Sequence, residues 1–407
     1  LHGGDHPRLG DGSLSGRPAT LGGRPVFETP LAFVRPTVEE PDRVMASVRS
    51  SLESGRLTDG PLVGELEGRL AEALQVGHCV ALSSCTVGLM LVIQALRPAG
   101  AVLIPSFTFS ATAHAARWNG ADIAFADCDE ETWCLTPNEV YGRPGMIIGV
   151  HVSGVPCDVE GLAKAAADLG ADLIYDAAHG GGSQVTSGGR RRPLAGFGTA
   201  EVFSLTPTKV LSGAEGGFVT TNDGALAEQL RVARNYGNPG DYDTRFAGLN
   251  ARLSELHAAL ALAALDHLEE RVAHRNSLAG RYRSALSSLP GIGFQRVPAG
   301  GRSSFKDFTV LVDGEAFGCS RDAVRLALQA EGVETRAYYS PPVHRQQAYR
   351  DVASPPLPVT DRLASQVVSL PIWSHMPPET VDRVGEAFAR IHAHAEEIAA
   401  RQVQPKR

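Results

Sequence analysis

Short apolar runs, each of strand length, follow one another along the chain from about residue 78. They read "HCVALSS", "AVLIPSFTF", "DIAFADCD", "MIIGVHV", "DLIYDAA", "AEVFSL" and "GGFVTTND", and helical patterns such as "VGLMLVIQAL" and "VEGLAKAAADLG" separate several of them. Strands that are apolar throughout are buried on both faces, and their alternation with helices is typical of a mainly parallel sheet covered on both sides. The sequence therefore predicts an α/β fold whose ligands bind beyond the carboxyl ends of the strands.

The two ends of the chain differ from this pattern. The first 25 residues are rich in Gly, Pro and Arg and have little apolar periodicity, which is typical of a loosely held segment. After residue 250 comes a long helical stretch, interrupted only by Gly280, that "LPGIG" ends, and then a mixture of strand and helix patterns. We expect a flexible N-terminal arm over residues 1–25, a large domain over 26–260 and a smaller α+β domain over 261–407.

Composition excludes several classes of partner. The formal net charge is -7 and the chain has no polybasic block, so neither nucleic acid nor an anionic membrane is an expected partner. No stretch has the apolar length of a membrane helix, and the N-terminus lacks the pattern of a secretion signal, so we expect a cytoplasmic protein. The six cysteines form no C-x-x-C pair, so we expect neither a metal site nor a disulfide framework.

One lysine stands in an unusual place. Only four of the 38 Lys and Arg residues are lysines, and Lys209 lies among small residues at the end of an apolar run, in "FSLTPTKVLSGAEGG". Arginine is always protonated, whereas a lysine amine can lose its proton and attack a carbonyl. The sequence therefore marks Lys209 as a candidate nucleophile, with a chance survivor of the bias against lysine as the alternative.

Three further motifs lie at the ends of predicted strands. "SSCT", residues 83–86, precedes a helix, where free amides and the helix dipole favour a phosphate. "IYDAAHGGG" places Asp176 and His179 after an apolar strand, and a carboxylate at that depth needs a positive partner such as a protonated pyridine nitrogen. "PSFTFSATAH" offers Phe107 and Phe109 for stacking on a flat ring. Each motif alone has an ordinary structural alternative, as a helix cap, a turn or core packing. Together with the lysine they describe pyridoxal phosphate.

The order of these motifs resembles a known family. "DAAH", "FSLTPTKVLSGAEGG" and "GLNARLSELHAAL" are similar to segments of the DegT/DnrJ/EryC1/StrS family of pyridoxal-phosphate-dependent sugar aminotransferases, and the resemblance runs from about residue 55 to 388. It implies fold type I, the aspartate aminotransferase-like fold, with a mainly parallel seven-stranded sheet in the large domain and a smaller C-terminal domain.

The resemblance also implies roles for individual residues. Lys209 matches the Schiff-base lysine, Asp176 the partner of the pyridine nitrogen, and His179 the residue that bonds the phenolic oxygen. The remaining matches are cofactor contacts and residues near the substrate cleft: Phe109 for ring stacking, Ser84, Cys85, Thr86 and Ser204 for the phosphate, Asn250 for the neighbouring subunit's site, and Arg252, Arg336, Tyr338 and His344 for the substrate. Two positions depart from the family: Cys85, where glycine is common, and Thr206, where histidine is common.

The function implied is transfer of an amino group from L-glutamate to a nucleotide-linked keto-sugar, in deoxyaminosugar biosynthesis for a secondary metabolite or a surface glycan. The nearest likeness is to enzymes that act on the 4-keto group of a dTDP-6-deoxyhexose. A 3-keto-sugar and a cyclitol ketone such as scyllo-inosose are alternatives. The match at Asn250 implies a homodimer with shared active sites.

Three other functions are considered. A family member that only binds a sugar nucleotide or regulates is disfavoured because the lysine, the aspartate and the histidine are all present. A nicotinamide-dependent oxidoreductase would need a G-x-G-x-x-G turn after the first strand, which the sequence lacks. A cysteine desulfurase of the same fold would need a mobile reactive cysteine, and Cys319 is left open for that role.

Overall fold

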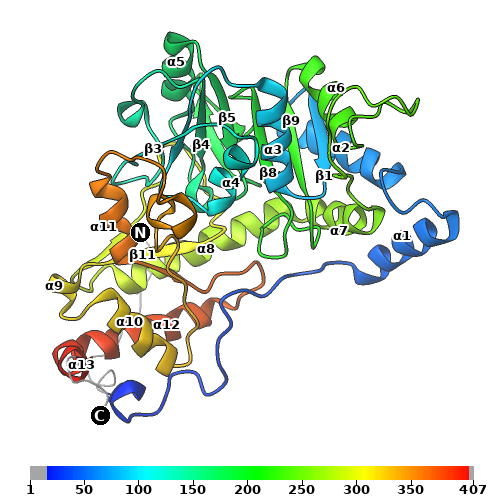
Figure 1. Cartoon of the computed structure of the whole chain (residues 1–407). Helices are drawn as coiled ribbons and strands as arrows, with labels where there is room; N and C mark the ends of the chain where they lie inside the picture. Colours follow the sequence, from blue (N-terminus) through cyan, green and yellow to red (C-terminus); the bar gives the residue numbers. More distant parts are fainter. Residues whose placement is uncertain (1–15, 403–407) are drawn as a thin grey trace.

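A seven-stranded sheet forms the centre of the larger domain in this computed structural model, which describes residues 16–402 (Figure 1). The strand order is β1-β9-β8-β5-β4-β2-β3. All of these strands run parallel except β9, which is antiparallel to both of its neighbours. The strands are β1 (His78–Leu82), β2 (Val102–Pro105), β3 (Ile123–Ala126), β4 (Met146–Val150), β5 (Asp172–Asp176), β8 (Ala200–Ser204) and β9 (Gly217–Thr221). The predicted fold class is confirmed.

Helices cover both faces of this sheet because alternate strand residues point to opposite sides. Val202 of β8 packs on the face that α3 (Cys85–Leu96), α4 (Ser110–Trp118) and α6 (Gly224–Ala233) cover. Its neighbour Phe203 packs on the other face, against α2 (Pro61–Leu74) and α7 (Glu255–Asp266). Farther along that face, α5 (Val159–Leu169) packs on β4 and β5. A short hairpin, β6 (Gln184–Ser187) and β7 (Arg190–Pro193), lies outside the main sheet.

A smaller antiparallel sheet forms the C-terminal domain, in the order β10 (Ile292–Phe294), β11 (Phe308–Val312) and β12 (Val367–Leu370). Its core includes Tyr282 and Phe388, which belong to two packed helices, α8 (Leu268–Leu286) and α12 (Pro378–Ala393). The other helices of this half are α9 (Gly314–Phe317), α10 (Arg321–Ala330), α11 (Pro358–Gln366) and α13 (Ala395–Gln402).

The long helical stretch after residue 250 consists of two helices. The backbone leaves the helical path at His267, where φ is -103° and ψ is 7°, whereas Gly280 lies inside α8. On one side of this break, α7 packs against α2 and α1 (Pro41–Ser54), and on the other side α8 packs against α12. The division into domains at residue 260 stays a prediction, and this break lies a few residues beyond it.

Residues 1–15 of the expected N-terminal arm lie outside the described residues. Residues 16–25 are packed on the C-terminal domain, where the short helix η1 (Ala19–Leu21) buries Leu21 in the core. The carboxylate of Glu331 accepts hydrogen bonds from the backbone N–H groups of Ala19, at 2.7 Å, and Val26, at 2.8 Å. Val26 packs in the same core as the C-terminal residues, a long-range contact that composition does not reveal.

Within residues 16–402, no helix is both long and apolar enough to cross a membrane. The same part of the chain brings no three His, Cys, Asp or Glu side chains together as ligands for a metal ion. The cytoplasmic location stays a prediction.

Candidate active site

A cavity of about 310 Å³ lies beyond the carboxyl ends of the central strands, where the strand pattern predicts a site. The sheet side of its wall contains eight of the predicted residues, namely Ser84, Cys85, Thr86, Phe109, Asp176, His179, Ser204 and Lys209. Tyr338 reaches the same cavity from the C-terminal domain. Motifs separated by more than a hundred residues thus meet in one place.

The start of α3 forms the hydroxyl-rich end of the cavity. Ser84 caps this helix by accepting a hydrogen bond from the N–H of Val87 at 3.1 Å. The N–H groups of a first helical turn have no partner within the helix, so they favour an anion. The serine and threonine side chains that line the cavity are those of Ser84, Thr86, Thr108, Ser204, Thr206 and Thr208. This end therefore suits a phosphate group.

Strand β9 comes very close to this turn. A Cβ atom at Gly217 would lie 2.4 Å from the backbone nitrogen of Cys85 and 2.7 Å from the carbonyl oxygen of Phe203. Only glycine therefore allows β9 to pair with β8 while the first turn of α3 packs against it. The thiol of Cys85 contacts the carbonyl oxygen of Val202 at 3.6 Å, and burial raises its pKa well above the usual range. This departure from the family leaves an uncharged side chain beside the turn.

Asp176 is the last residue of β5 and is buried. One carboxylate oxygen accepts a hydrogen bond from the hydroxyl of Thr112, at 2.7 Å, and the other accepts from the N–H of Ala178, at 3.1 Å. Burial raises the pKa of Asp176, although these two bonds and the charge of Lys209 act in the opposite direction. A buried carboxylate in this state is stabilised by a cation, and a protonated ring nitrogen is one. Thr112 was missed because a threonine inside a helix carries no signal.

Two histidines of the cavity have a fixed tautomer. Nδ1 of His179 accepts from the N–H of Ser153 at 3.2 Å, and Nδ1 of His151 accepts from the N–H of Cys157 at 3.1 Å. Burial lowers the pKa of His179 well below its usual value, helped by nearby lysines, and lowers the pKa of His151 to about 3. Both rings are therefore neutral and carry their proton on Nε2, which makes each a hydrogen-bond donor. His151 was not predicted.

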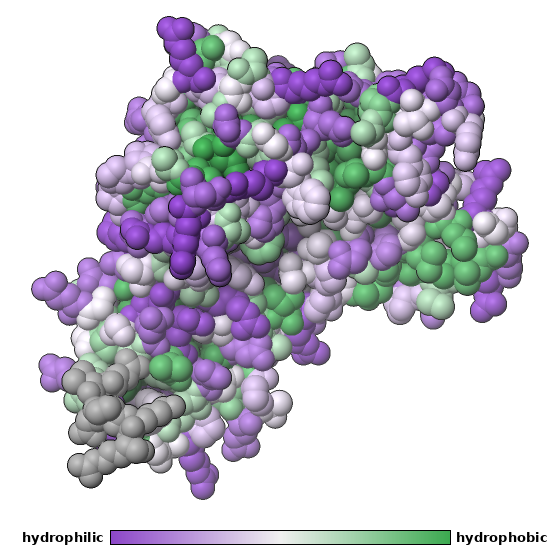
Figure 2. All heavy atoms as spheres, in the orientation of Figure 1, coloured by the Kyte–Doolittle hydropathy of each residue, from purple (hydrophilic) through white to green (hydrophobic). Residues whose placement is uncertain are grey.

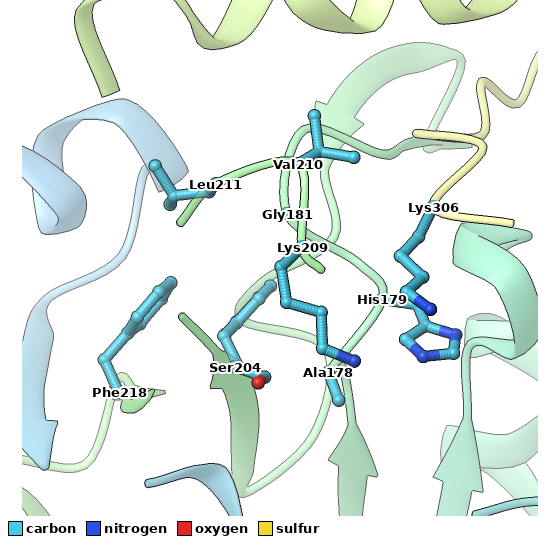
Figure 3. Close-up of a pocket in the computed structure, with 10 residues that line it drawn as sticks. Ala178, His179, Gly181, Ser204, Lys209, Val210, Leu211, Phe218 and Lys306 are labelled. Atoms are coloured by element: carbon cyan, nitrogen blue, oxygen red, sulfur yellow. The ribbon is translucent and has the colours of Figure 1, made fainter. Parts of the chain in front are cut away.

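Lys209 lies in the loop between β8 and β9. Figure 3 shows its side chain extended past Ser204 toward Ala178, with His179 and Lys306 on one side of its amine. Burial lowers the pKa of Lys209 to about 8, and the charge of Lys306 acts in the same direction. About a tenth of the amine is therefore unprotonated at pH 7, and the unprotonated amine is the form that attacks a carbonyl.

Phe109 and Phe107 have different surroundings. Phe107 is fully buried and packs edge-on against Tyr339, with 5.4 Å between ring centroids. Phe109 lines the cavity although 60% of its surface is exposed. An aromatic ring that is exposed at the mouth of a cavity is available to cover a flat ligand.

The C-terminal domain supplies a part of the wall that the sequence did not mark. Lys306, Asp307 and Tyr339 line the cavity beside Tyr338. Lys306 precedes a strand and had no distinguishing pattern, so only the tertiary structure brings it here. Its Nζ lies 2.8 and 3.0 Å from the two carboxylate oxygens of Asp307.

Four predicted residues lie away from the cavity of the single described chain. Asn250 is exposed and accepts a hydrogen bond from Arg252 at 3.3 Å. Arg336 lies over the ring of Phe33, 5.2 Å from its centroid. His344 bonds Ser106 at 2.7 Å, so its contacts are those of a structural residue. These four roles stay predictions.

Comparisons with known proteins agree with this geometry. The model of the DegT/DnrJ/EryC1/StrS aminotransferase family matches residues 39–389. A UDP-N-acetyl-3-dehydro-alpha-D-glucosamine 3-aminotransferase of Acidithiobacillus ferrooxidans is 33% identical over 356 residues, which cover 86% of this chain and 94% of that protein. A dTDP-3-amino-3,4,6-trideoxy-alpha-D-glucose transaminase of Streptomyces venezuelae is 32% identical over 351 residues, which cover 84% of this chain and 90% of that protein. The crystal structure of DesI with its TDP-sugar product superposes with a TM-score of 0.89 at 36% identity, covering 95% of this chain and 99% of that one.

Proposed function

The chain belongs to the DegT/DnrJ/EryC1/StrS aminotransferase family, and from that premise we propose that it transfers the amino group of L-glutamate to a nucleotide-linked keto-sugar. It is a pyridoxal-phosphate-dependent transaminase, as the resemblance implied. The observation that carries the proposal is the position of Lys209, whose amine shares one cavity with the buried carboxylate of Asp176 and the hydroxyl-rich start of α3.

The residues present fit pyridoxal phosphate. The start of α3 with Thr86 and Ser204 would hold the phosphate, Asp176 would face the ring nitrogen and Phe109 would cover the ring. Nε2 of His179 would donate to the phenolic oxygen. When bound, the cofactor supplies an aldehyde that exchanges with amines and a ring that accepts electrons.

The protein's own groups then have separate tasks. With the cofactor bound, the amine of Lys209 would hold the proton that leaves the Cα atom of the donor, because its lowered pKa leaves part of the amine unprotonated. Asp176 would stabilise a positive charge at the ring nitrogen.

We also propose which nucleotide the acceptor sugar carries and which of its carbons receives the amino group. The likeness to DesI, whose structure holds a TDP-sugar product, supports a TDP-linked acceptor. An Escherichia coli relative, 28% identical, is named dTDP-4-amino-4,6-dideoxy-D-glucose transaminase, and this supports the 4-keto position. Two relatives are named for amino groups at the 3-position, so a 3-keto-sugar is the second candidate.

We also propose a homodimer with shared sites. Asn250 and Arg252 lie on the segment that follows an exposed loop, in which Tyr242 is 95% exposed. Figure 2 shows apolar side chains gathered over α1, where Met45 and Leu52 are exposed. A second copy would cover this apolar face and bring Asn250 to a neighbouring cavity.

The desulfurase alternative loses its candidate residue. Cys319 is buried in the core of the C-terminal domain, and burial raises its pKa to about 11. Such a thiol is not a nucleophile near neutral pH.

The test follows the cofactor and the amino group separately. The visible absorption of the protein with pyridoxal phosphate is recorded before and after addition of L-glutamate, with Lys209→Ala as the control. We expect glutamate to discharge the absorption in the wild type and not in the variant. With ¹⁵N-labelled glutamate and dTDP-4-keto-6-deoxyglucose or its 3-keto isomer, mass spectrometry of the sugar product then identifies the acceptor. Sugar binding without any transfer of label would contradict the proposal.

A further inference from the structure

Two of the chain's four lysines reach the same cavity. Lys209 comes from the sheet domain and Lys306 from the segment before β11, and Figure 3 shows both side chains close to His179. Lys306 is buried, with only 6% of its surface exposed. Burying an ammonium group is costly unless the group is paired and hydrogen-bonded.

The backbone around Lys306 is fixed from two sides. Arg275, buried on α8, donates from Nη1 to the carbonyl oxygens of Phe305, at 2.9 Å, and Lys306, at 3.3 Å. The N–H of Lys306 donates to the carbonyl oxygen of Ser153 at 3.2 Å. The position of Lys306 is therefore set by both domains, unlike that of a surface lysine.

The ammonium group of Lys306 has two neighbours, which do not use all of its N–H donors. Asp307 accepts at 2.8 and 3.0 Å, and the ring of Tyr338 lies 5.4 Å from Nζ. An ammonium group has three N–H donors in a threefold arrangement, so one carboxylate and one ring face leave room for a further acceptor. The ammonium lines the cavity, where a ligand can reach it.

The cavity contains two carboxylates and two ammonium groups, so the binding of an anionic ligand depends on which ammonium stays accessible. In the described chain the charged side chains that line it are Asp176, Asp307, Lys209 and Lys306, and none is an arginine. With Asp176 facing a ring nitrogen and Lys209 bound to the cofactor, Lys306 is the ammonium that stays available. Of the two substrates, the amino-acid donor is the one that carries a carboxylate on its reacting carbon. A keto-sugar has no charge there.

We propose that Lys306 binds the carboxylate next to the reacting amine of the amino-acid donor, and that Asp307 and Tyr338 hold the ammonium in position. This inference rests on the proposed transaminase function and adds a donor subsite to it. Because the sugar lacks that carboxylate, Lys306 serves one half of the reaction and not the other.

The test separates the two halves. The holoenzyme with Lys306→Met is mixed with L-glutamate in single-turnover experiments, and the same variant loaded with pyridoxamine phosphate is mixed with the keto-sugar. We expect the glutamate concentration for half-maximal rate to rise about tenfold to hundredfold, the size of a lost hydrogen bond to a charged group. The sugar concentration for half-maximal rate should change by less than about threefold, within the usual scatter of an indirect effect. Lys306→Arg should recover part of the affinity for glutamate.

A binding measurement provides a readout that does not need turnover. Glutarate and L-2-methylglutamate are titrated calorimetrically into the same holoenzymes. Both ligands have carboxylates, but only the methylated amino acid has one beside an amine. Lys306→Met should therefore lower the affinity for 2-methylglutamate more than the affinity for glutarate. Lys164→Met is the matched control, because Lys164 is an exposed lysine on α5 whose Nζ lies 2.6 Å from the carboxylate of Asp168.

Three outcomes would decide against the proposal. Unchanged dependence on glutamate in Lys306→Met would remove Lys306 from the donor site. An equal loss for both substrates, or failure of Lys306→Arg to recover any affinity, would indicate a structural role. If the wild type accepts nitrogen from no amino acid, the proposed function itself fails, which is a separate result from the first two.

Discussion

Arg271 of α8 donates a hydrogen bond from Nη1 to the carbonyl oxygen of Val210, at 2.8 Å, on the residue directly after Lys209. Its Nε bonds the carboxylate of Glu39 at 2.8 Å, and its Nη2 bonds the carbonyl oxygen of Thr37 at 3.2 Å. One buried guanidinium thus joins the lysine loop, the N-terminal segment and the long helix of the C-terminal domain.

Replacement of Arg271 by methionine should destabilise the protein. The change leaves Glu39 and the carbonyl oxygen of Val210 without their partner, so we expect a loss of about 3 kcal/mol in the free energy of unfolding. Arg281→Met is the control, because Arg281 lies on the same helix in an exposed pair with Asp382, and such pairs contribute less than about 1 kcal/mol. Urea unfolding of the cofactor-free proteins measures both. Equal losses would contradict the role given to Arg271.

The stability of the cofactor-free protein should depend on pH through Lys209. The pKa of its amine is about 8 in the folded protein, against an ordinary value of 10.5. Between these values the unfolded chain binds the proton and the folded protein does not, so stability rises with pH across this window. Below it, both states are protonated and the full cost of the buried charge is present.

Lys209→Met removes this contribution. We expect the variant to exceed the wild type in stability at pH 7 by roughly 3 kcal/mol, since each pKa unit corresponds to about 1.4 kcal/mol. The difference should shrink as the pH rises through the window from 8 to 10.5. Urea unfolding of both proteins at a series of pH values measures it, and a difference that stays constant would show that the amine is not desolvated.

Asp176 and Thr112 should affect cofactor chemistry to different degrees. Asp176→Asn removes the negative charge, so we expect the rate of discharge by glutamate to fall about 100-fold or more, as for the loss of a buried electrostatic contact. Thr112→Val removes only one hydrogen bond to the same carboxylate, and a loss of about tenfold is expected. Stopped-flow absorption at saturating glutamate measures the rates. A larger effect at Thr112 than at Asp176 would mean that the carboxylate is held for structural reasons.

Mixed dimers test whether sites are shared between subunits. Lys209→Ala and Asn250→Ala should each inactivate the homodimer if Asn250 completes the partner's cavity. A heterodimer of the two chains then contains one site with both residues intact, and we expect roughly half of the wild-type activity for a two-site dimer. Differently tagged chains, co-expressed and purified through both tags, provide the heterodimer. No recovery of activity in a protein of dimer mass would place Asn250 in its own subunit's site.

The sheet side of the site could be predicted because its residues follow strands in the sequence. Ser84, Asp176 and Ser204 each stand at the end of an apolar run, and the ends of parallel strands meet at one edge. The other wall could not be predicted in this way. Lys306 and Asp307 arrive through the packing of a second domain, and no periodic pattern in the sequence records which of its loops faces the sheet.

Neighbouring positions in one motif also separate in space. Tyr338 lines the cavity, whereas Arg336 and His344, which are close to it in the sequence, do not. An irregular segment has no repeating geometry from which the direction of each side chain follows, so all three looked equally suitable. The position of the helix break could not be predicted either. Glycine at 280 is the stronger helix breaker in the sequence, but the helix continues through it and the break lies at His267, where the packing partners of the helix change.

The strand order also has a consequence for synthesis on the ribosome. β1 is the first strand of the sheet to leave the ribosome, but its partner is β9, the last strand. The edge strand β1 therefore stays unpaired until most of the domain has been translated. The turn at Ser84 reaches its place only when Gly216 pairs beside it, and Lys306 emerges later still. A nascent chain therefore offers no complete cofactor pocket before β9 is made, and no donor subsite before Lys306 emerges.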